Sequence, residues 1–403
     1  MLTRSGKIVF TLGFLAVVVL GGVIFLKSSP NTDIPSFVAL QQSSSFEPTE
    51  EMLNTLRKPL SSFGVDADTV SGGVYFSSGG QYVLFQADPK PVEGQMESGS
   101  RVIFADIKKG TMKKIYDGTL VGAPSWSENI VTFSSDGIYM YNINEGVLNV
   151  VSSAGLNPLI SPDEHFIAYQ DKGISIFSIQ SRGTTVLTEN KYDRPALWMN
   201  DVTKLLVFKS NAVELGEGAG EQQFVGIIDS VTKNIQELTS VPKGRFYGAK
   251  KVGNSILING GFDDGRSDYL LNPENDTTTT TINQGVALAE VLVDSSKDMV
   301  DVYTEGVVKS FDATGATVGM VTLANVPPSN IPYWLKSDDS TIWLGYLKGS
   351  DMSQVEILKW NKKTGEQEGT PFLLDSSTIF FSQSSVYASI SQDRTMLIFN
   401  IIK

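Results

Sequence analysis

The feature that most constrains the fold is a unit of short strands and tight turns that recurs along the chain. One copy reads NPLISPDEHFIAYQDKGISIFSIQSRGTTVLT, from residue 157 to residue 188. Runs of β-branched and aromatic residues alternate in it with Gly, Asp, Asn and Ser, a pattern typical of strands joined by turns. The pattern predicts one antiparallel sheet with a strand ending at Ile160, a turn at 161–163, and strands over 165–170, 174–179 and 184–187.

Related copies occupy most of the chain from Gly72 onward. They include residues 72–110, 123–146 and 196–239, and more diverged copies follow up to Lys403. The 332 residues from 72 to 403 divide into about eight copies of about 41 residues, inside the roughly 40 to 45 residues of a four-stranded propeller blade. We therefore expect an all-β fold, a β-propeller of about eight four-stranded blades, with seven longer blades as the alternative.

The copy SPDEHFIAY followed by ISIFSIQSRGTTVLT resembles the WD40-like repeats of the TolB and dipeptidyl-peptidase propellers. In that family a Ser-Pro-Asp turn precedes an apolar strand, and a strand-turn-strand ending in Leu-Thr follows. Two sets of residues are predicted at equivalent positions of different copies: Trp126, Trp198 and Trp334 in the first strand, and Asp201, Asp338 and Asp339 in the turn. The tryptophans are interpreted as repeated packing residues. The resemblance implies a fold and leaves the function open, because propellers carry many unrelated functions.

Closing a ring of sheets requires that the last sheet be completed. The final copy has three predicted strands, over residues 379–382, 386–390 and 395–401. Without a fourth strand it would leave an unpaired edge. We therefore expect a segment before Gly72 to supply that strand, with Ser36–Leu40 and Asp66–Val70 as the candidates.

An apolar run near the N-terminus predicts a membrane anchor. Residues 8–26 carry no charge, and at a rise of about 1.5 Å per residue a helix of this length spans a bilayer. Because Arg4 and Lys7 precede the run, residues 1–7 are expected in the cytoplasm and the rest of the chain across the membrane. The alternative is a cleaved signal peptide, which the length of the run and the following Lys-Ser-Ser-Pro disfavour.

Residues 27–71 are predicted to be a stalk and lead-in to the propeller of residues 72–403. Their first part is rich in Ser, Pro, Asn and Gln, a composition that spaces a domain from a membrane. A short helix is expected over 50–58, because Thr49 can cap its first amides and acidic residues follow. The favoured interpretation is a helix packed on the rim of the propeller.

Composition excludes several chemistries. The chain has no cysteine and a single histidine, so disulfide frameworks, thiolate metal sites and cysteine nucleophiles are ruled out, and only His165 is left for a catalytic relay. After the three basic residues of positions 1–27, the rest carries 29 basic against 44 acidic residues. Such an acidic chain should repel nucleic acid, so no nucleic-acid partner is expected.

The candidate site residues carry weak signals. His165 follows a turn and is expected to be a surface residue. Asp263, Asp264 and Asp268 offer oxygen atoms to a metal such as calcium, but Asp and Gly also make ordinary hairpin turns. The acidic group of Asp294, Asp298 and Asp301 is expected to be structural, with paired-carboxylate catalysis as the alternative. The sequon-bearing NDTTTTT of 275–281 is interpreted as an exposed polar strand or loop, with glycosylation as the alternative. The glycine-rich GEGAGEQQ of 216–223 is interpreted as a loop.

These observations favour a membrane-anchored, extracytoplasmic β-propeller that acts as a protein-interaction or scaffold module of the cell envelope. Its expected partners are the membrane, through residues 8–26, and an envelope or surface protein; the propeller would lie in a periplasm or at a cell surface. No catalytic residue and no cofactor is predicted. The alternative function is a propeller enzyme or carbohydrate-binding protein that uses carboxylates at the mouth of the central channel.

Overall fold

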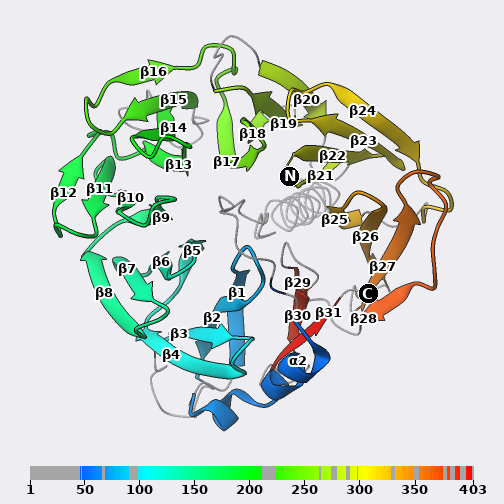
Figure 1. The fold of residues 1–403 in the computed structure, drawn as a ribbon, viewed down its shortest axis with the longest axis horizontal. Helices are drawn as coiled ribbons and strands as arrows, with labels where there is room; N and C mark the ends of the chain where they lie inside the picture. Colours follow the sequence, from blue (N-terminus) through cyan, green and yellow to red (C-terminus); the bar gives the residue numbers. More distant parts are fainter. Residues whose placement is uncertain are drawn as a thin grey trace, which may run out of the picture. The chain divides into compact units, whose positions relative to one another are not determined.

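Figure 1 shows the computed structural model of the chain, which divides into residues 1–36 and residues 37–403. The structure describes residues 46, 48–65, 69–89, 99–210, 223–262, 265–273, 279–286, 291–296, 298–327, 332–348, 354–374, 379–381, 386–390 and 396–401. The apolar run of residues 8–26 and the segment 36–40 lie outside these ranges. Within the ranges, no helix is both long and apolar enough to span a bilayer.

The described residues form eight antiparallel sheets, built in order along the chain. The first four have four strands each, and we call them blades 1 to 4. Blade 1 contains β1 (Thr69–Phe76), β2 (Tyr82–Asp88), β3 (Arg101–Asp106) and β4 (Thr111–Asp117). Blade 2 contains β5 (Val121–Trp126), β6 (Ile130–Ser134), β7 (Ile138–Asn142) and β8 (Val147–Ser152). Blade 3 contains β9 (Leu156–Ile160), β10 (Phe166–Gln170), β11 (Ile174–Ser178) and β12 (Thr184–Val186). Blade 4 contains β13 (Arg194–Trp198), β14 (Lys204–Ser210), β15 (Gln223–Asp229) and β16 (Ile235–Glu237).

Blades 5 to 7 repeat this arrangement, and the last sheet has three described strands. Blade 5 contains β17 (Arg245–Val252), β18 (Ser255–Phe262), β19 (Gly265–Leu271) and β20 (Thr279–Val286). Blade 6 contains β21 (Val291–Ser295), β22 (Met299–Thr304), β23 (Val307–Asp312) and β24 (Thr317–Thr322). Blade 7 contains β25 (Pro332–Ser337), β26 (Thr341–Lys348), β27 (Gln354–Asn361) and β28 (Phe372–Leu374). The last sheet contains β29 (Ile379–Phe381), β30 (Val386–Ile390) and β31 (Leu397–Ile401).

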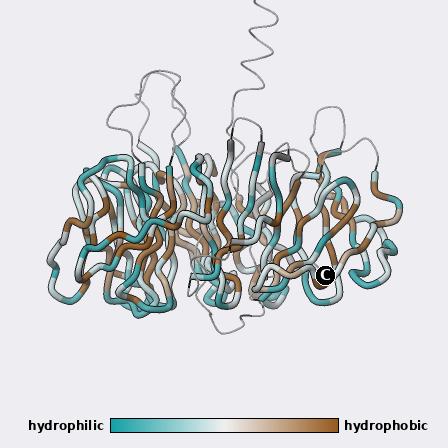
Figure 2. Tube along the Cα trace, turned by 90° about the horizontal axis from the view of Figure 1, so that it is seen from above, coloured by the Kyte–Doolittle hydropathy of each residue, from teal (hydrophilic) through white to brown (hydrophobic). Residues whose placement is uncertain are grey.

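The sheets of this unit follow one another round a ring, each with its first strand innermost (Figure 1). Side chains of a strand point alternately to the two faces of its sheet. Because each sheet of the ring lies between two neighbours, both of its faces pack against a neighbouring sheet. Hydrophobic clusters fill these junctions: six of them each join two consecutive blades, and a seventh joins blade 1 to the last sheet. Hydrophobic segments accordingly run through the middle of the strands, with hydrophilic turns at their ends (Figure 2).

The repeat analysis therefore predicted the propeller correctly. In the copy of residues 157–188, strands β9 to β12 fall where the pattern places them, to within one or two residues. The propeller begins slightly earlier than predicted, because β1 starts at Thr69 and not at Gly72.

The expected helix is also present. Helix α2 (Glu50–Leu56) is capped by Thr49, whose hydroxyl accepts a hydrogen bond from the Met52 amide at 3.3 Å. A 3-10 helix, η1 (Leu60–Phe63), follows it. Leu53 and Leu56 of α2 are fully buried in the cluster that joins blade 1 to the last sheet. The helix thus packs on the rim, as predicted.

One of the two candidates for the closing strand is wrong. Residues 69–70, the end of the candidate segment Asp66–Val70, pair with β2 in blade 1 and so add no strand to the last sheet. The other candidate, Ser36–Leu40, lies outside the described residues. Along β31 the structure instead places helix α2, whose Arg57 cap donates two hydrogen bonds to the Phe399 carbonyl. In the described part of the chain, the ring is therefore closed by the packing of helix α2 against strand β31.

Candidate functional site

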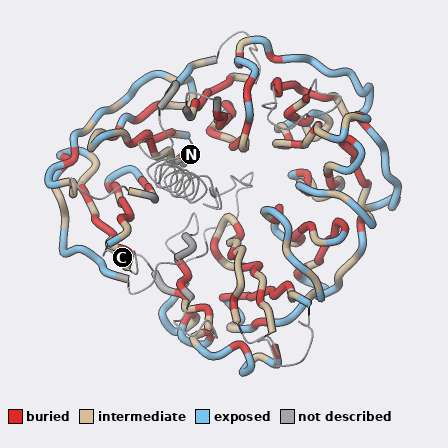
Figure 3. The backbone as a smooth tube through the Cα atoms, turned by 180° about the vertical axis from the view of Figure 1, so that it is seen from behind, coloured by how far each residue is buried: buried red, intermediate tan, exposed pale blue. Residues whose placement is uncertain are grey.

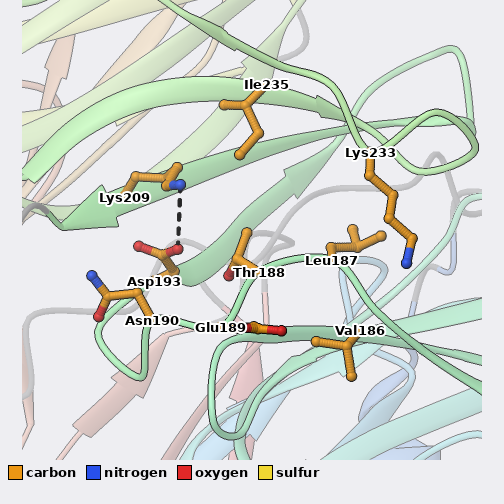
Figure 4. Close-up of a pocket in the computed structure, with 9 residues that line it drawn as sticks. All are labelled: Val186, Leu187, Thr188, Glu189, Asn190, Asp193, Lys209, Lys233 and Ile235. Atoms are coloured by element: carbon orange, nitrogen blue, oxygen red, sulfur yellow. Dashed lines mark ion pairs between the residues drawn. The ribbon is translucent and has the colours of Figure 1, made fainter.

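A pocket of about 490 Å³ lies between blades 3 and 4 (Figure 4). One side of the pocket, its floor in Figure 4, is formed by the end of β12 and the segment that leads to β13. The opposite side is formed by β14 and the β15–β16 hairpin. The lining combines apolar side chains with charges of both signs: Val186, Leu187, Thr188, Glu189, Asn190, Asp193, Lys209, Lys233 and Ile235. The volume lies within the range of small-ligand sites, but the lining is more polar than is typical of them.

The most buried charge in the pocket is Asp193, which has no exposed surface. Its Oδ1 accepts a hydrogen bond from the Ser210 amide at 3.0 Å, and this bond fixes the carboxylate at the start of β13. Its Oδ2 lies 3.6 Å from the Lys209 Nζ and accepts no hydrogen bond from any described residue. A buried carboxylate oxygen without a hydrogen bond is unusual in proteins, and the charge of Lys209 is its compensating partner here.

The rest of the lining is held in place by local bonds. Asn190 uses its amide to donate to the Ser210 carbonyl at 2.6 Å, and its Oδ1 accepts from the Tyr192 amide. The Thr188 hydroxyl accepts from the Ile174 amide at 3.0 Å. Lys233 stands on the opposite hairpin with its ammonium pointing toward the floor, and Glu189 projects from the floor itself (Figure 4). The pocket therefore offers two cations, two carboxylates and an apolar surface.

A second group of polar residues lies on the inner strands of blades 5 to 7. Lys250 of β17 is 2% exposed, and its Nζ donates to the Ser295 carbonyl of β21 at 2.6 Å. Burial lowers the pKa of Lys250, and the charge of Asp294 opposes this. Asp294 of β21 accepts from the Ser337 amide of β25 at 2.9 Å. Burial raises the pKa of Asp294, with Lys250 and the Ser337 hydrogen bond acting against it. These contacts tie three consecutive blades together.

Asp301 lies next to this group, because it is the cross-strand partner of Asp294. Its carboxylate is 5% exposed and accepts from Lys362 Nζ at 2.6 Å and from the Ser310 hydroxyl. The third acidic residue, Asp298, is exposed in the β21–β22 turn. The structure therefore brings together two of the three aspartates, and a lysine neutralises one of them.

His165 is exposed, and its Nδ1 lies 3.0 Å from Asp163 Oδ2. Ser161 is in the same turn, but its hydroxyl donates to Asp163 and not to the imidazole. A nucleophilic relay needs the imidazole between the serine and the carboxylate. Here the carboxylate lies between the other two, so this trio stabilises the turn.

The metal candidates are not brought together. Asp263 and Asp264 lie outside the described residues. Asp268 is fully buried in β19, where it accepts hydrogen bonds from Asn259, Arg266 and Asn283. Its oxygens are used by these donors, and the described ranges contain no group of three or more metal-ligating side chains. Residues 216–222 and most of 275–281 are also outside the description.

Two of the three predicted tryptophans are equivalent. Trp126 and Trp198 each end the first strand of their blade and are 4% and 5% exposed. Trp198 packs between blades, since its Nε1 donates to the Leu159 carbonyl of β9 at 3.0 Å. Trp334 is different: the equivalent position in blade 7 is Ser337, and Trp334 lies three residues earlier in β25. In the turn, all three aspartates are exposed, and Asp201 and Asp338 accept backbone hydrogen bonds from residues just after them.

Exposed residues follow the outermost strands of the blades (Figure 3). Large apolar side chains are among them on β24 and β28 of blades 6 and 7, where Val318, Met320, Phe372 and Leu373 are exposed. They are also among them on three neighbouring blades, where β8, β12 and the β15–β16 hairpin carry an arc that sequence patterns had not identified. We call it the outer apolar arc: Val147, Val150, Val186, Val231 and Ile235. Val150 is 61% exposed and Val231 is 74% exposed. Val186 and Ile235 also line the pocket, so the arc and the pocket are continuous.

Comparisons with known proteins bear on the fold alone. No protein-family model and no curated sequence matches the chain. Among solved structures, dipeptidyl peptidase 4 of Porphyromonas gingivalis is similar, with a TM-score of 0.53 and 13% identity over 86% of this chain and 58% of that one. The Dos1 propeller has a TM-score of 0.50 and 10% identity over 80% of this chain and 90% of its own.

The fold is a β-propeller of four-stranded antiparallel blades. This part of the family resemblance is confirmed, and it includes the likeness to peptidase propeller domains. The chain spans little more than half of the dipeptidyl peptidase that it matches. At 13% identity the likeness shows a common fold only.

Proposed function

We propose that this chain is a membrane-anchored, extracytoplasmic propeller that binds another protein of the cell envelope or surface through its outer apolar arc. The observation that carries the proposal is the arc itself. Large apolar side chains from three neighbouring blades are exposed there, on the outermost strands β8, β12 and β16 and in the β15–β16 turn. Contiguous exposed apolar surface is costly in water and commonly marks a place where another protein binds.

The strands beneath the arc support this assignment. Strands β12 and β16 are only three residues long and lie at the edges of their sheets. Edge strands this short disfavour pairing with a strand of another protein. We therefore expect the partner to bind through contacts with the exposed side chains. Blade 1 offers the contrast, because its outermost strand β4 exposes Thr111, Lys113 and Lys114 and no large apolar side chain.

The location rests on the sequence of the N-terminal segment. An uncharged run over residues 8–26 follows Arg4 and Lys7, an arrangement that favours a cytoplasmic N-terminus and a propeller on the far side of the membrane. Residues 28–403 carry more acidic than basic side chains. Their net negative charge should repel the propeller from anionic lipid headgroups.

One observation favours a second candidate function, a carbohydrate-binding or hydrolytic propeller. Asp294 and Asp301 are cross-strand partners on the inner strands, and burial raises the pKa of Asp294. Glycoside hydrolysis requires one protonated and one ionised carboxyl group on either side of the bond that is cleaved. However, Asp301 is buried and paired with Lys362, so we favour the interaction module.

The location can be tested by cysteine labelling, because the natural chain contains no cysteine. Two single-cysteine variants, Ser5→Cys and Ser181→Cys, place a thiol before the apolar run and in an exposed turn of blade 3. In intact cells, a membrane-impermeant maleimide should label the Ser181→Cys variant alone. Both should react after the membrane is permeabilised. Labelling of Ser5→Cys alone in intact cells would contradict the proposed orientation.

A further inference from the structure

Strand β24 of blade 6 is an unprotected sheet edge. It is the outermost strand of its sheet and lies at the rim of the ring (Figure 1). Among the described residues, the backbone of Thr317–Thr322 forms no backbone hydrogen bonds beyond its ladder with β23. Natural edge strands are commonly protected by charged side chains, by proline or by a length of only a few residues. Strand β24 is six residues long and contains neither a charge nor a proline, so its outward backbone groups can pair with another strand.

The sequence around β24 is uncharged as well. Residues 313–327 contain no charged residue, although the whole chain has a net charge of −12. Two copies of so acidic a chain repel each other over most of their surface, and the repulsion is smallest where an uncharged segment faces its own copy. The edge of β24 is therefore suited to a second copy of this chain.

The exposed side chains of β24 are arranged symmetrically about Met320. Met320 is 70% exposed, and Val318 and Thr322 are exposed two residues before and after it, whereas Gly319 and Val321 between them are partly buried. The ladder with β23 has one bulge, before Gly319, and is regular from there to Thr322.

This symmetry fits an antiparallel pair of identical strands. Such a pair has a two-fold axis, and residues that lie opposite each other point to the same face of the sheet. With the axis at Met320, Val318 lies opposite Thr322 of the second copy, and Met320 lies opposite itself. These cross-strand pairs are apolar or β-branched, and they bring no like charges together.

We propose that two copies of this chain associate through β24, which pairs antiparallel with β24 of the second copy about a two-fold axis at Met320. The two copies of blade 6 then form one continuous sheet. Because both copies use the same strand, the contact is complete with two copies. The pairing is independent of the outer apolar arc, which lies on blades 2 to 4.

The outermost strands of blades 1 and 2 are less suited to self-pairing. Strand β4 carries Lys113 and Lys114 near its middle, so an antiparallel pair of β4 strands would bring lysines together. In the middle of β8, Asn149 accepts a hydrogen bond from Arg182 of the next blade, so a pair of β8 strands would bring two arginines together. Like charges placed opposite each other destabilise a strand pair.

The register can be tested by disulfide cross-linking of the full chain in detergent, because the natural chain contains no cysteine. Met320→Cys should form a linked dimer by itself on oxidation, since the two thiols lie opposite each other at the axis. Val318→Cys and Thr322→Cys should each form about tenfold less linked dimer alone than when the two are mixed, because two copies of residue 318 are about 13 Å apart along the strands, beyond the reach of a disulfide. Lys114→Cys, an exposed position on β4, is the control and should form no linked dimer.

The strength of the association can be measured by sedimentation velocity of the full chain in detergent. One pair of six-residue strands is a small contact, so we expect a reversible dimer with a Kd in the micromolar range. Met320→Lys places two like charges opposite each other at the axis and should raise this Kd about tenfold or more. Val231→Lys is the matched control, because Val231 is 74% exposed but lies in the outer apolar arc; it should leave the Kd unchanged. Thermal unfolding of each variant shows that it is folded.

Four results would overturn the proposal. The first is a monomer at all concentrations up to about 100 μM. The second is a dimer whose Kd is the same for Met320→Lys and the natural chain, which would place the contact elsewhere, as in an association through residues 8–26. The third is a linked dimer of Val318→Cys alone as abundant as in the mixture, and the fourth is a linked dimer of Lys114→Cys as abundant as that of Met320→Cys. Failure here would leave the outer apolar arc and its partner untouched.

Discussion

Arg57 and Phe399 are 342 residues apart in sequence and are joined by two hydrogen bonds, from Arg57 Nε at 3.0 Å and Nη2 at 2.9 Å to the Phe399 carbonyl. The bonds connect the C-terminal cap of α2 to β31 of the last sheet. Leu53 and Leu56 of the same helix pack with Leu397 and Phe399 in one buried cluster. The N-terminal helix therefore holds the last sheet against blade 1.

We predict that Arg57→Ala lowers the free energy of unfolding by about 1 to 3 kcal/mol, because a partly buried carbonyl loses two charged donors. The measurement is urea unfolding of the full chain in detergent. Arg182→Ala serves as the control, since Arg182 makes an exposed bond to Asn149 Oδ1 at 3.2 Å; its effect should stay within about 0.5 kcal/mol. Equal effects of the two substitutions would mean that Arg57 does not hold the closure.

The two equivalent tryptophans provide a second matched comparison. Trp198 donates to the Leu159 carbonyl of the preceding blade, whereas Trp126 Nε1 has no hydrogen-bond partner among the described residues. Substitution by phenylalanine removes the indole N–H at both sites and reduces the side-chain volume by the same amount. We therefore expect Trp198→Phe to be more destabilising than Trp126→Phe by about 1 kcal/mol in urea unfolding. A larger loss for Trp126→Phe would contradict this account of the blade junction.

The stability of the chain should also depend on the ionisation of Asp294. Burial raises its pKa above the ordinary value of 3.8, so between these two values the folded state binds more protons than the unfolded state. The free energy of unfolding contributed by Asp294 is therefore largest at low pH and falls as the pH rises through the raised pKa.

This dependence can be isolated by substitution. Asp294→Asn keeps an acceptor for the Ser337 amide and removes the ionisation, so the fall in stability above pH 3.8 should be smaller in the variant. The measurement is urea unfolding of both proteins from about pH 4 to about pH 7. Asp298→Asn, an exposed change in the same hairpin, is the control and should keep the natural profile. Parallel profiles for natural protein and Asp294→Asn would contradict the assignment.

The regular parts of the fold could be read from the sequence because they rest on local rules. Alternation of apolar residues and turn residues located β9 to β12, and Thr49 with the following acidic residues located α2. Positions that depend on register were less predictable. Trp334 was aligned with Trp126 and Trp198 by residue type, but a shift of three residues places Ser337 there instead.

The sites could not be read in the same way, because they form between residues far apart in sequence. Lys250 and Ser295 meet only when blades 5 and 6 pack together. The pocket likewise joins Leu187 and Asp193 to Lys209 and Lys233 across a blade junction. The packing of α2 along β31 was not predicted for a related reason, because it depends on the contact between the distant residues Arg57 and Phe399.

The most direct test of the proposed function is photo-crosslinking from the outer apolar arc. Single cysteines at Val150→Cys and Val186→Cys, in a chain that has none, would carry a benzophenone maleimide in intact membranes. Lys114→Cys on the outermost strand of blade 1 is the control, because that position is exposed but has no apolar neighbours of this kind. We expect both arc positions to crosslink to the same protein and Lys114→Cys not to do so. Crosslinking that is absent, or equal at all three positions, would contradict the proposal that the arc is an interaction surface.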